Sequence, residues 1–335
     1  MTIESACLPA IDVMIPVAAK DLAGLDTCIA GLIAHCRNPI RSVSVVGAAR
    51  LAGRVRVEGA VQWIDEESVA PKPASIEAAL RAAGGDHNNA SWYFQQLIKL
   101  GCFQILPGAG RHILVLDADY TLVDNIVFVD EDGKSVLALG YPLHWRLGTR
   151  EHVIPARHSA IVAANRLLAE WRPVDPYSGM QHHIVFDRQI LADLIRRVER
   201  QHERPFREAF LTTVEHEKWT GASEYVLYRH FAARFFPGRI RSRHLDAIDI
   251  IQPAENARWS LTDAVAAARR AGVQAIGCHS FLDYRNRIAT MDYIPDGVRG
   301  RLQAAPGALM LDLSQGVLHI APAALPLGCS RVLAD

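Results

Sequence analysis

Two hydrophobic patterns alternate over the first fifty residues of the chain. An apolar run at 10–18, which contains Pro16, has the length and composition of a buried strand. Apolar residues then recur near helical spacing over 20–36, behind Asp21, a favoured helix N-cap residue. A second β-branched run follows at 41–49. This order predicts a β-α-β unit with two parallel strands, and ligands of such sheets bind at the carboxyl ends of the strands.

The alternation of strands and helices continues along the rest of the chain. Helical patterns cover 73–84, 92–103, 188–201 and 223–236, and apolar runs typical of strands cover 112–116, 135–141 and 182–187. Residues 309–322 are typical of a β-hairpin that turns at Ser314-Gln315-Gly316. We find no internal repeat. The pattern predicts an α/β fold with a mainly parallel central sheet flanked by helices. We expect one domain over 1–295, with a C-terminal hairpin extension over 296–335 packed on it.

Composition narrows the class of protein. Half of the 335 residues are apolar, which supports a sizeable core, and 36 basic residues balance 36 acidic ones, which argues against a dedicated nucleic-acid surface. The six cysteines show no paired spacing, so we expect neither a zinc site nor a disulfide framework. No window approaches the ~20 apolar residues of a membrane span, and no secretory signal is visible. A cytoplasmic protein with a small-molecule partner is expected.

The strongest chemical signal is the pair Asp117 and Asp119 at the end of the apolar run 112–116. Alternate residues of an extended chain can point the same way, and two neighbouring carboxylates repel unless a cation lies between them. Mg²⁺ or Mn²⁺ would relieve that repulsion and keep open positions for the oxygens of a diphosphate. The alternative without function is two aspartates that end a strand and begin a turn.

The stretch 112–125 fits one enzyme class directly. Its hydrophobic strand, Asp-x-Asp-x-Thr-Leu and further Asp resemble the first motif of haloacid-dehalogenase-type phosphatases. That resemblance implies Asp117 as the nucleophile and Asp119 as the acid/base. Against it, the motif normally opens its domain, whereas a β-α-β unit precedes it here, and no later strand carries the expected metal-binding aspartates. The phosphatase is kept as the alternative function.

Four stretches, in order, carry a second resemblance. They are a first strand with a Lys-Asp-Leu turn, a Trp-Tyr-x-Gln-Gln-x-x-Lys-Leu helix before the Asp-x-Asp strand, a His-His strand and a Ser-Glu-Tyr helix, at 12–22, 91–125, 179–191 and 223–237. Together they resemble a bacterial family, long of unknown function, that is grouped with GT-A type nucleotide-sugar glycosyltransferases. The match spans residues 12 to about 237. Tyr120 is a minor departure, because family members often carry Thr or another small residue there.

This resemblance implies a metal-dependent enzyme that moves a sugar from a nucleoside diphosphate sugar, a UDP-sugar as first expectation, to an acceptor hydroxyl, for example in surface polysaccharide synthesis. The residues expected to bind the donor are Pro16, Val17, Lys20, Trp92, Gln95, Gln96, Lys99 and Asp117. The residues expected to hold Mn²⁺ or Mg²⁺ are Asp117, Asp119 and His279. A noncatalytic nucleotide-sugar binding protein remains a further alternative.

The helix before the Asp-x-Asp strand has a physical interpretation of its own. Trp92, Gln95, Gln96 and Lys99 fall at i, i+3, i+4 and i+7 and share one face. Lys99 could neutralise phosphate, and the glutamines could bind sugar or ribose hydroxyls. Equally, the stripe could face solvent.

Three residues are candidates for the acceptor side of the site. Glu224 follows Ser223 at the start of a helix, where capping alone could explain it, but the resemblance implies a general base if the enzyme inverts. In a retaining enzyme that role is not needed. His182 and His183 begin a strand and point to opposite faces, so only one of them can reach the site. The sequence does not separate the two.

Overall fold

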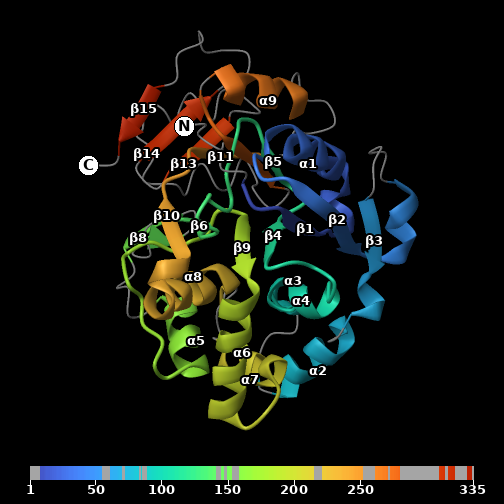
Figure 1. Ribbon diagram of the computed structural model, residues 1–335, viewed down its shortest axis with the longest axis vertical. Coiled ribbons are helices and arrows are strands. Elements are labelled where there is room, and N and C mark those ends of the chain that lie inside the picture. Colours follow the sequence, from blue (N-terminus) through green and yellow to red (C-terminus); the bar gives the residue numbers. More distant parts are fainter. Residues whose placement is uncertain are drawn as a thin grey trace, which may run out of the picture.

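A five-stranded sheet in the order β3-β2-β1-β4-β9 crosses the middle of the molecule (Figure 1). In this computed structural model the described residues are 8–54, 61–69, 72–82, 84, 89–140, 145–146, 149–152, 158–214, 221–251, 261–270, 272–279, 309–313, 316–320 and 330–333. The strands are β1 Ile11–Pro16, β2 Ile40–Gly47, β3 Val61–Asp65, β4 His112–Leu116 and β9 His183–Asp187. The first four are parallel, and β9 runs antiparallel to β4. This confirms the predicted α/β fold with a mainly parallel central sheet.

The predicted β-α-β unit is confirmed, with α1 Leu22–His35 between β1 and β2. Asp21 occupies the N-cap position of α1, but its side chain makes no capping hydrogen bond. It forms an ion pair with Lys20 instead, with 3.2 Å between Lys20 Nζ and Asp21 Oδ1. The helix therefore begins where the sequence predicts, without the interaction that motivated the prediction.

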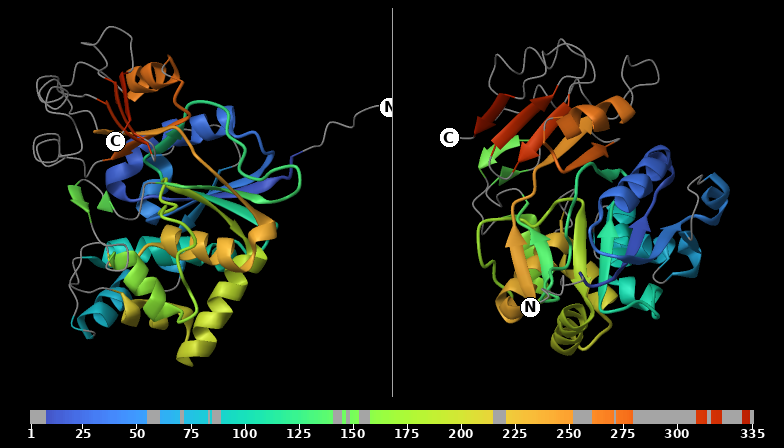
Figure 2. Two further views of the ribbon diagram at one scale, coloured as in Figure 1. Left: turned by 90° about the vertical axis from the view of Figure 1, so that its left-hand side faces the viewer. Right: turned by 45° about the horizontal axis from the view of Figure 1, so that its top comes forward.

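The sheet separates two hydrophobic cores, because alternate residues of its strands face opposite sides. Met14 and Val115 belong to one core, whereas Ile15 and Leu114 belong to the other. The first side is covered by most of the helices, and α1 covers the second (Figures 1 and 2). The helices on the first side are α2 Pro73–Ala82, α3 Ala90–Leu100, α4 Cys102–Ile105, α5 Ser159–Leu167, α6 Arg188–His202, α7 Phe206–Thr213 and α8 Glu224–Phe235. β1, β4 and β9 are buried along their whole length, which explains why their residues are mostly apolar, whereas β3 at the edge of the sheet is only partly buried.

The predicted helices are present, with one difference. The helix expected at 92–103 is divided into α3 and α4 at Gly101, whose N–H bonds to the carbonyl of Leu97 and ends α3. No helix in the described part of the chain is long and apolar enough to cross a membrane.

A second sheet, which the sequence does not predict, has the order β15-β14-β13-β11-β12-β5 and lies above the first in Figure 1. Its strands are β5 Tyr120–Leu122, β11 Ala247–Ile251, β12 Ala275–His279, β13 Leu309–Leu313, β14 Gly316–Ile320 and β15 Ser330–Leu333, and α9 Leu261–Arg270 lies between β11 and β12 in the chain. The predicted hairpin is confirmed as the antiparallel pair β13 and β14. The domain boundary at 295 remains a prediction, since 280–308 lie outside the described residues.

The segment 117–119 joins the two sheets, because β4 ends at Leu116 and β5 begins at Tyr120. Two short pairs complete the fold: β6 Ser135–Ala138 with β10 Ile240–Arg243, and β7 Trp145–Arg146 with β8 Thr149–His152. The turn that carries both aspartates therefore lies at the carboxyl end of the first sheet, beside the second.

Asp187, at the end of β9, is a buried anchor of the fold. Its carboxylate contacts Arg111 Nε at 2.8 Å and Arg239 Nη2 at 2.9 Å, and it accepts hydrogen bonds from the first two N–H groups after Arg188 in α6. Burial alone would raise the pKa of Asp187, but hydrogen bonds from His112 and the two arginines outweigh it and hold this pKa well below its usual range.

We predict that Asp187→Ala destabilises the protein by about 3 to 5 kcal/mol at pH 7, because two arginines lose their carboxylate and α6 loses its cap. A lowered carboxyl pKa contributes stability that is present above the unfolded pKa of about 3.9 and lost as pH falls through the folded pKa. The gap in unfolding free energy between parent and variant should therefore narrow below about pH 5. Urea unfolding measures it. Asp132→Ala, at an exposed position, is the control, and equal effects of both changes would contradict the prediction.

Candidate functional site

A buried lysine lies at the centre of the candidate site. Lys99, near the end of α3, is 2% exposed. Its ammonium lies 2.7 Å from Asp117 Oδ1 and 2.8 Å from Glu224 Oε1, and it donates a hydrogen bond to the Tyr225 hydroxyl at 3.0 Å. Burial alone would lower the pKa of Lys99, but Asp117 and Glu224 outweigh it and raise this pKa well above its usual value. The site is thus built around a fixed, charged ammonium.

The start of α8 is held against α3 by Gln96. The Gln96 side chain accepts a hydrogen bond from the backbone N–H of Glu224 at 3.1 Å and donates one to the carbonyl of Ala222 at 3.3 Å. Ser223 caps the helix by accepting from the N–H of Val226. Of the predicted stripe, Gln96 and Lys99 are buried against the start of α8, whereas Trp92 and Gln95 are half-buried.

Asp117 follows β4 directly, and both of its carboxylate oxygens have protein contacts. Oδ1 pairs with Lys99, while Oδ2 accepts a hydrogen bond from the Tyr225 hydroxyl at 3.2 Å and lies 3.4 Å from Nδ1 of His182. Burial alone would raise the pKa of Asp117, but Lys99 and the contact with His182 together outweigh it and hold this pKa well below its usual range. Asp117 is therefore an ionised group of the protein's own charge network.

Asp119 lies in a different environment. It is half-buried, and its carbonyl accepts a hydrogen bond from the N–H of Cys278 at 2.6 Å. The pKa of Asp21 is raised, first by burial and then by the negative charge of Asp119, which places the two carboxylates within electrostatic range of each other. Oxygen ligands that repel each other fit the needs of a divalent cation.

A complete metal site is not assembled within the described part of the chain. No three His, Cys, Asp or Glu side chains come together there in a way that could hold a metal ion. His279, the expected third ligand, ends β12, but its side chain lies outside the described residues. The carboxylates of Asp119 and Asp21 are of the chemical type that Mg²⁺ and Mn²⁺ prefer, while Asp117 already contacts Lys99.

The structure separates the two histidines. His182 has a left-handed backbone, with φ of 55°, and turns its ring toward Asp117 with a quarter of the side chain exposed. His183 is buried between the rings of Tyr120 and Phe128, at centroid distances of 5.5 and 5.3 Å, and its Nδ1 lies 2.9 Å from the carbonyl of Gln181. Burial lowers the pKa of His183 to about 3, so this imidazole is neutral.

The remaining predicted donor-binding residues lie at the end of β1. Pro16 is its last residue, and Val17 is buried, with its N–H bonded to the carbonyl of Val46 at 2.8 Å. Lys20 is exposed beside Asp21. The carboxyl ends of β1 and β4 are neighbours in the sheet, since Met14 pairs with Val115. Lys20 and Asp119 therefore belong to the same edge.

Sequence reasoning missed three residues that matter here, one of which is Asp21, predicted only as a helix N-cap. Tyr225 joins Lys99 to Asp117, and it could have been found from its place in the Ser-Glu-Tyr stretch beside Glu224. Arg243 ends β10, and nothing in its sequence context indicates that it approaches this edge.

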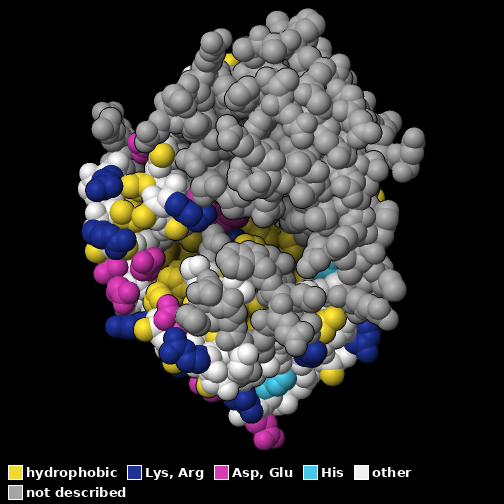
Figure 3. Space-filling model, turned by 180° about the vertical axis from the view of Figure 1, so that it is seen from behind, with side chains coloured by type: hydrophobic (Ala, Val, Ile, Leu, Met, Phe, Trp, Pro, Cys, Tyr) yellow, Lys and Arg dark blue, Asp and Glu magenta, His cyan; other side chains and the backbone are white. Residues whose placement is uncertain are grey.

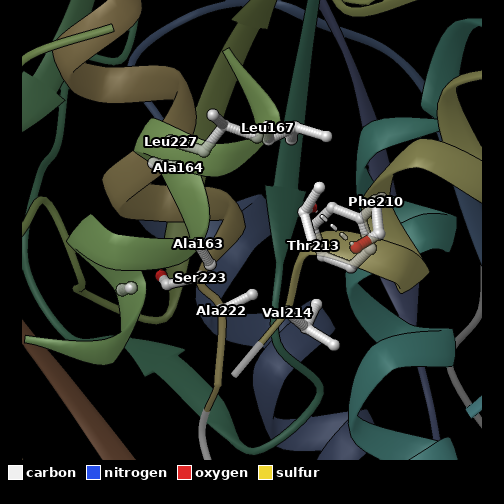
Figure 4. Close-up of a pocket in the computed structure, with 10 residues that line it drawn as sticks. Ala163, Ala164, Leu167, Phe210, Thr213, Val214, Ala222, Ser223 and Leu227 are labelled. Carbon is white, nitrogen blue, oxygen red and sulfur yellow. Dashed lines mark hydrogen bonds between the residues drawn. The ribbon is translucent and has the colours of Figure 1, made fainter. Parts of the chain in front are cut away.

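Lys99 does not line either of two cavities found in the described part of the chain. One of about 10 Å³ is enclosed by α5, α7 and α8; Ala164, Phe210 and Leu227 are among its lining residues, and Thr213 turns its hydroxyl to the Phe210 carbonyl (Figure 4). It has room for about one water molecule. The other, of about 300 Å³, lies near the amino ends of β1 and β2, beside the ion pair of Asp12 and Arg41.

The described surface, seen from behind, carries basic and acidic side chains side by side rather than in a patch of one sign, and it is hollowed near its centre (Figure 3).

No protein-family model and no curated protein matches the chain. Among solved structures, it is similar to the apo form of mouse xyloside xylosyltransferase 1, with a TM-score of 0.40 and 10% sequence identity. That match covers 81% of this chain and 98% of the mouse chain. The chemistry of the site therefore rests on this chain's own residues.

We predict that Lys99→Met destabilises the protein by about 3 to 5 kcal/mol, because Asp117 and Glu224 would be left buried without their cation. Urea unfolding at pH 7 measures the effect. Lys134→Met is the matched control, since Lys134 pairs with Asp132 at the surface, and it should change stability by about 0.5 kcal/mol or less. A loss below about 1 kcal/mol for Lys99→Met would show that the ammonium does not hold this cluster together.

Proposed function

We propose that the protein is a metal-dependent glycosyltransferase that moves a sugar from a nucleoside diphosphate sugar to an acceptor hydroxyl. The observation that carries the proposal is the pair Asp117 and Asp119 at the carboxyl end of β4, where Lys99 fixes one carboxylate and leaves the other beside Asp21. Ligands of mainly parallel α/β sheets bind at this edge. The order of the four family-like stretches supports the same function.

The two aspartates take different roles in this proposal. Asp119, with Asp21 nearby, is the carboxylate for Mn²⁺ or Mg²⁺, and Asp117 keeps Lys99 and Tyr225 in place behind it. A bound divalent cation would offset the negative charge that grows on the departing nucleoside diphosphate. Lys20, exposed at the end of β1, adds a positive charge on the donor side.

The base for the acceptor hydroxyl has two candidates, Glu224 and His182. Glu224 is 2% exposed and paired with Lys99, so its carboxylate already balances a buried cation. His182 is partly exposed, and Asp117 lies beside its Nδ1, which directs the other ring nitrogen away from that carboxylate. A non-glycine residue with positive φ is uncommon and costs energy, which fits a residue held for function. We therefore assign the acceptor contact to His182.

A thermal-shift screen tests the function. UDP-, GDP-, CMP- and dTDP-sugars are added with and without Mn²⁺, because a ligand that binds only the folded state raises the melting temperature. Transfer of the sugar to an added acceptor, or its hydrolysis, is then measured for the donor that binds. Release of inorganic phosphate from phosphate monoesters, without nucleotide binding, would replace this proposal with the phosphatase.

We predict that Asp119→Ala abolishes the part of nucleotide binding that depends on the metal, because the change removes a ligand and the charge that attracts the cation. Calorimetry with UDP, with Mn²⁺ and with EDTA, measures this difference. Asp124→Ala is the control, since Asp124 is exposed and follows in the same segment. If Asp119→Ala keeps the parent's affinity in Mn²⁺, Asp119 is not the metal carboxylate.

We predict that His182→Asn lowers the turnover rate by roughly 10²- to 10⁴-fold while donor affinity persists, because the general base is lost. Asn tolerates a positive φ, so the backbone should be retained. Glu224→Gln should lower the melting temperature, since Lys99 loses a counter-ion, and should cost less than about tenfold in turnover. The reverse pattern, with near-normal turnover in His182→Asn and a large loss in Glu224→Gln, would assign the base to Glu224.

A further inference from the structure

Arg243 lies at the same edge as the aspartates, although it comes from a different pair of strands. It is the last residue of β10, where it pairs with Ala138 of β6. Its guanidinium lies over the ring of Phe128, with 5.7 Å between Cζ and the ring centroid. The same Phe128 ring makes an edge contact with the ring of His183, and these three side chains form one cluster. His183 pairs with Leu116, the residue before Asp117. Arg243 is therefore connected to the end of β4 through the contacts of Phe128 and His183.

The Arg243 guanidinium is partly buried, and no carboxylate in the described part of the chain pairs with it. Its Nε and Nη2 atoms are buried and have no hydrogen-bond partner within the described part of the chain. Burial lowers the pKa of Arg243 to about 10, and among the described residues it is the Tyr120 hydroxyl, not a carboxylate, that opposes this effect. Arg41 and Arg229 differ, because each pairs with an aspartate. A buried cation without a partner costs free energy unless an anion binds it.

His183 presents a second unsatisfied atom in the same cluster. Its Nδ1 lies 2.9 Å from the carbonyl of Gln181, which requires the proton on Nδ1 and leaves Nε2 as an acceptor. Nε2 is buried and has no hydrogen-bond partner within the described residues. The cluster therefore offers N–H donors from Arg243 and one acceptor from His183. A phosphate oxygen can accept from the N–H groups of Arg243, and a hydroxyl group can donate to Nε2 of His183.

We propose that Arg243 binds a phosphate oxygen of a sugar phosphate group, with His183 Nε2 accepting a hydrogen bond from a hydroxyl of the same ligand. The ligand class, a phosphate ester that carries a hydroxyl, rests on the proposed function and adds a phosphate contact that does not involve the aspartates. Arg243 binds the ligand directly through charge-assisted hydrogen bonds, the geometry in which a guanidinium is favoured over an ammonium.

Arg243→Gln tests the phosphate contact, and Arg241→Gln is the matched control. Arg241 lies on the same strand, is half exposed and pairs with Asp130 and Asp132, so its loss should leave ligand binding unchanged. Calorimetry with pyrophosphate, UDP and uridine, in Mg²⁺ and in EDTA, compares these variants with the parent. We expect Arg243→Gln to weaken pyrophosphate and UDP binding by roughly 10- to 100-fold and to leave uridine unchanged. Near-UV circular dichroism checks that each variant is folded.

His183→Phe tests the hydroxyl contact, because it keeps the ring between Tyr120 and Phe128 but removes Nε2. It should weaken binding of UDP-glucose by roughly 3- to 10-fold and leave pyrophosphate binding unchanged. If His183→Phe weakened the binding of UDP-glucose and of pyrophosphate equally, or weakened the binding of neither, the hydroxyl contact would be overturned.

The outcomes separate this proposal from the proposed function. Pyrophosphate binding that is lost in Arg243→Gln supports the phosphate contact even if no sugar is transferred, in which case only the glycosyltransferase proposal fails. Equal pyrophosphate and UDP affinity in parent, Arg243→Gln and Arg241→Gln would overturn the phosphate contact, as would a parent that binds neither pyrophosphate nor UDP in Mg²⁺ or EDTA. If Arg243→Gln loses affinity only for UDP, and only in Mg²⁺, Arg243 still binds the phosphate, and the metal is needed for the diphosphate to reach Arg243.

Discussion

The buried ammonium of Lys99 is the constraint on which the candidate site depends. A lysine that is 2% exposed can stay charged only if carboxylates surround it, and it has two, Asp117 and Glu224. Asp117 follows β4 and Glu224 begins α8, so the ammonium of Lys99 holds α3 against both the end of β4 and the start of α8. Tyr225 closes the network by donating to Asp117 and accepting from Lys99. The edge of the sheet is therefore held by electrostatics rather than by apolar packing alone.

The charge balance of this network explains why a nucleoside diphosphate would need further cations. Two carboxylates around one ammonium leave one negative charge. Asp119 and Asp21 add two more, and Lys20 contributes one positive charge beside Asp21. A diphosphate brought to this edge would be repelled unless positive charge is added. A divalent ion at Asp119 and the guanidinium of Arg243, which has no carboxylate partner within the described residues, would each supply it.

The sequence predicts local features of this molecule well and long-range ones poorly. The β-α-β unit, α2, α8 and the hairpin of β13 and β14 were predictable, because periodicity and turn residues act within a short window. The second sheet was not, since it pairs the three residues of β5 with β12, far along the chain. Helical spacing placed Gln96 and Lys99 on one face but could not show that this face meets α8. The two histidines were inseparable, because a positive φ at His182 leaves no trace in the pattern.

The spacing of Asp117 and Asp119 has a physical meaning that differs from the expected one. Two residues that alternate along a strand should share an environment, but β4 ends at Leu116 and the chain turns before β5 begins at Tyr120. Asp117 therefore turns inward to Lys99, and Asp119 stays half-buried beside Asp21. Lys99 balances the charge of Asp117. In the proposed function, Asp119 is the carboxylate that a metal ion would contact, and Asp117 stays paired with Lys99.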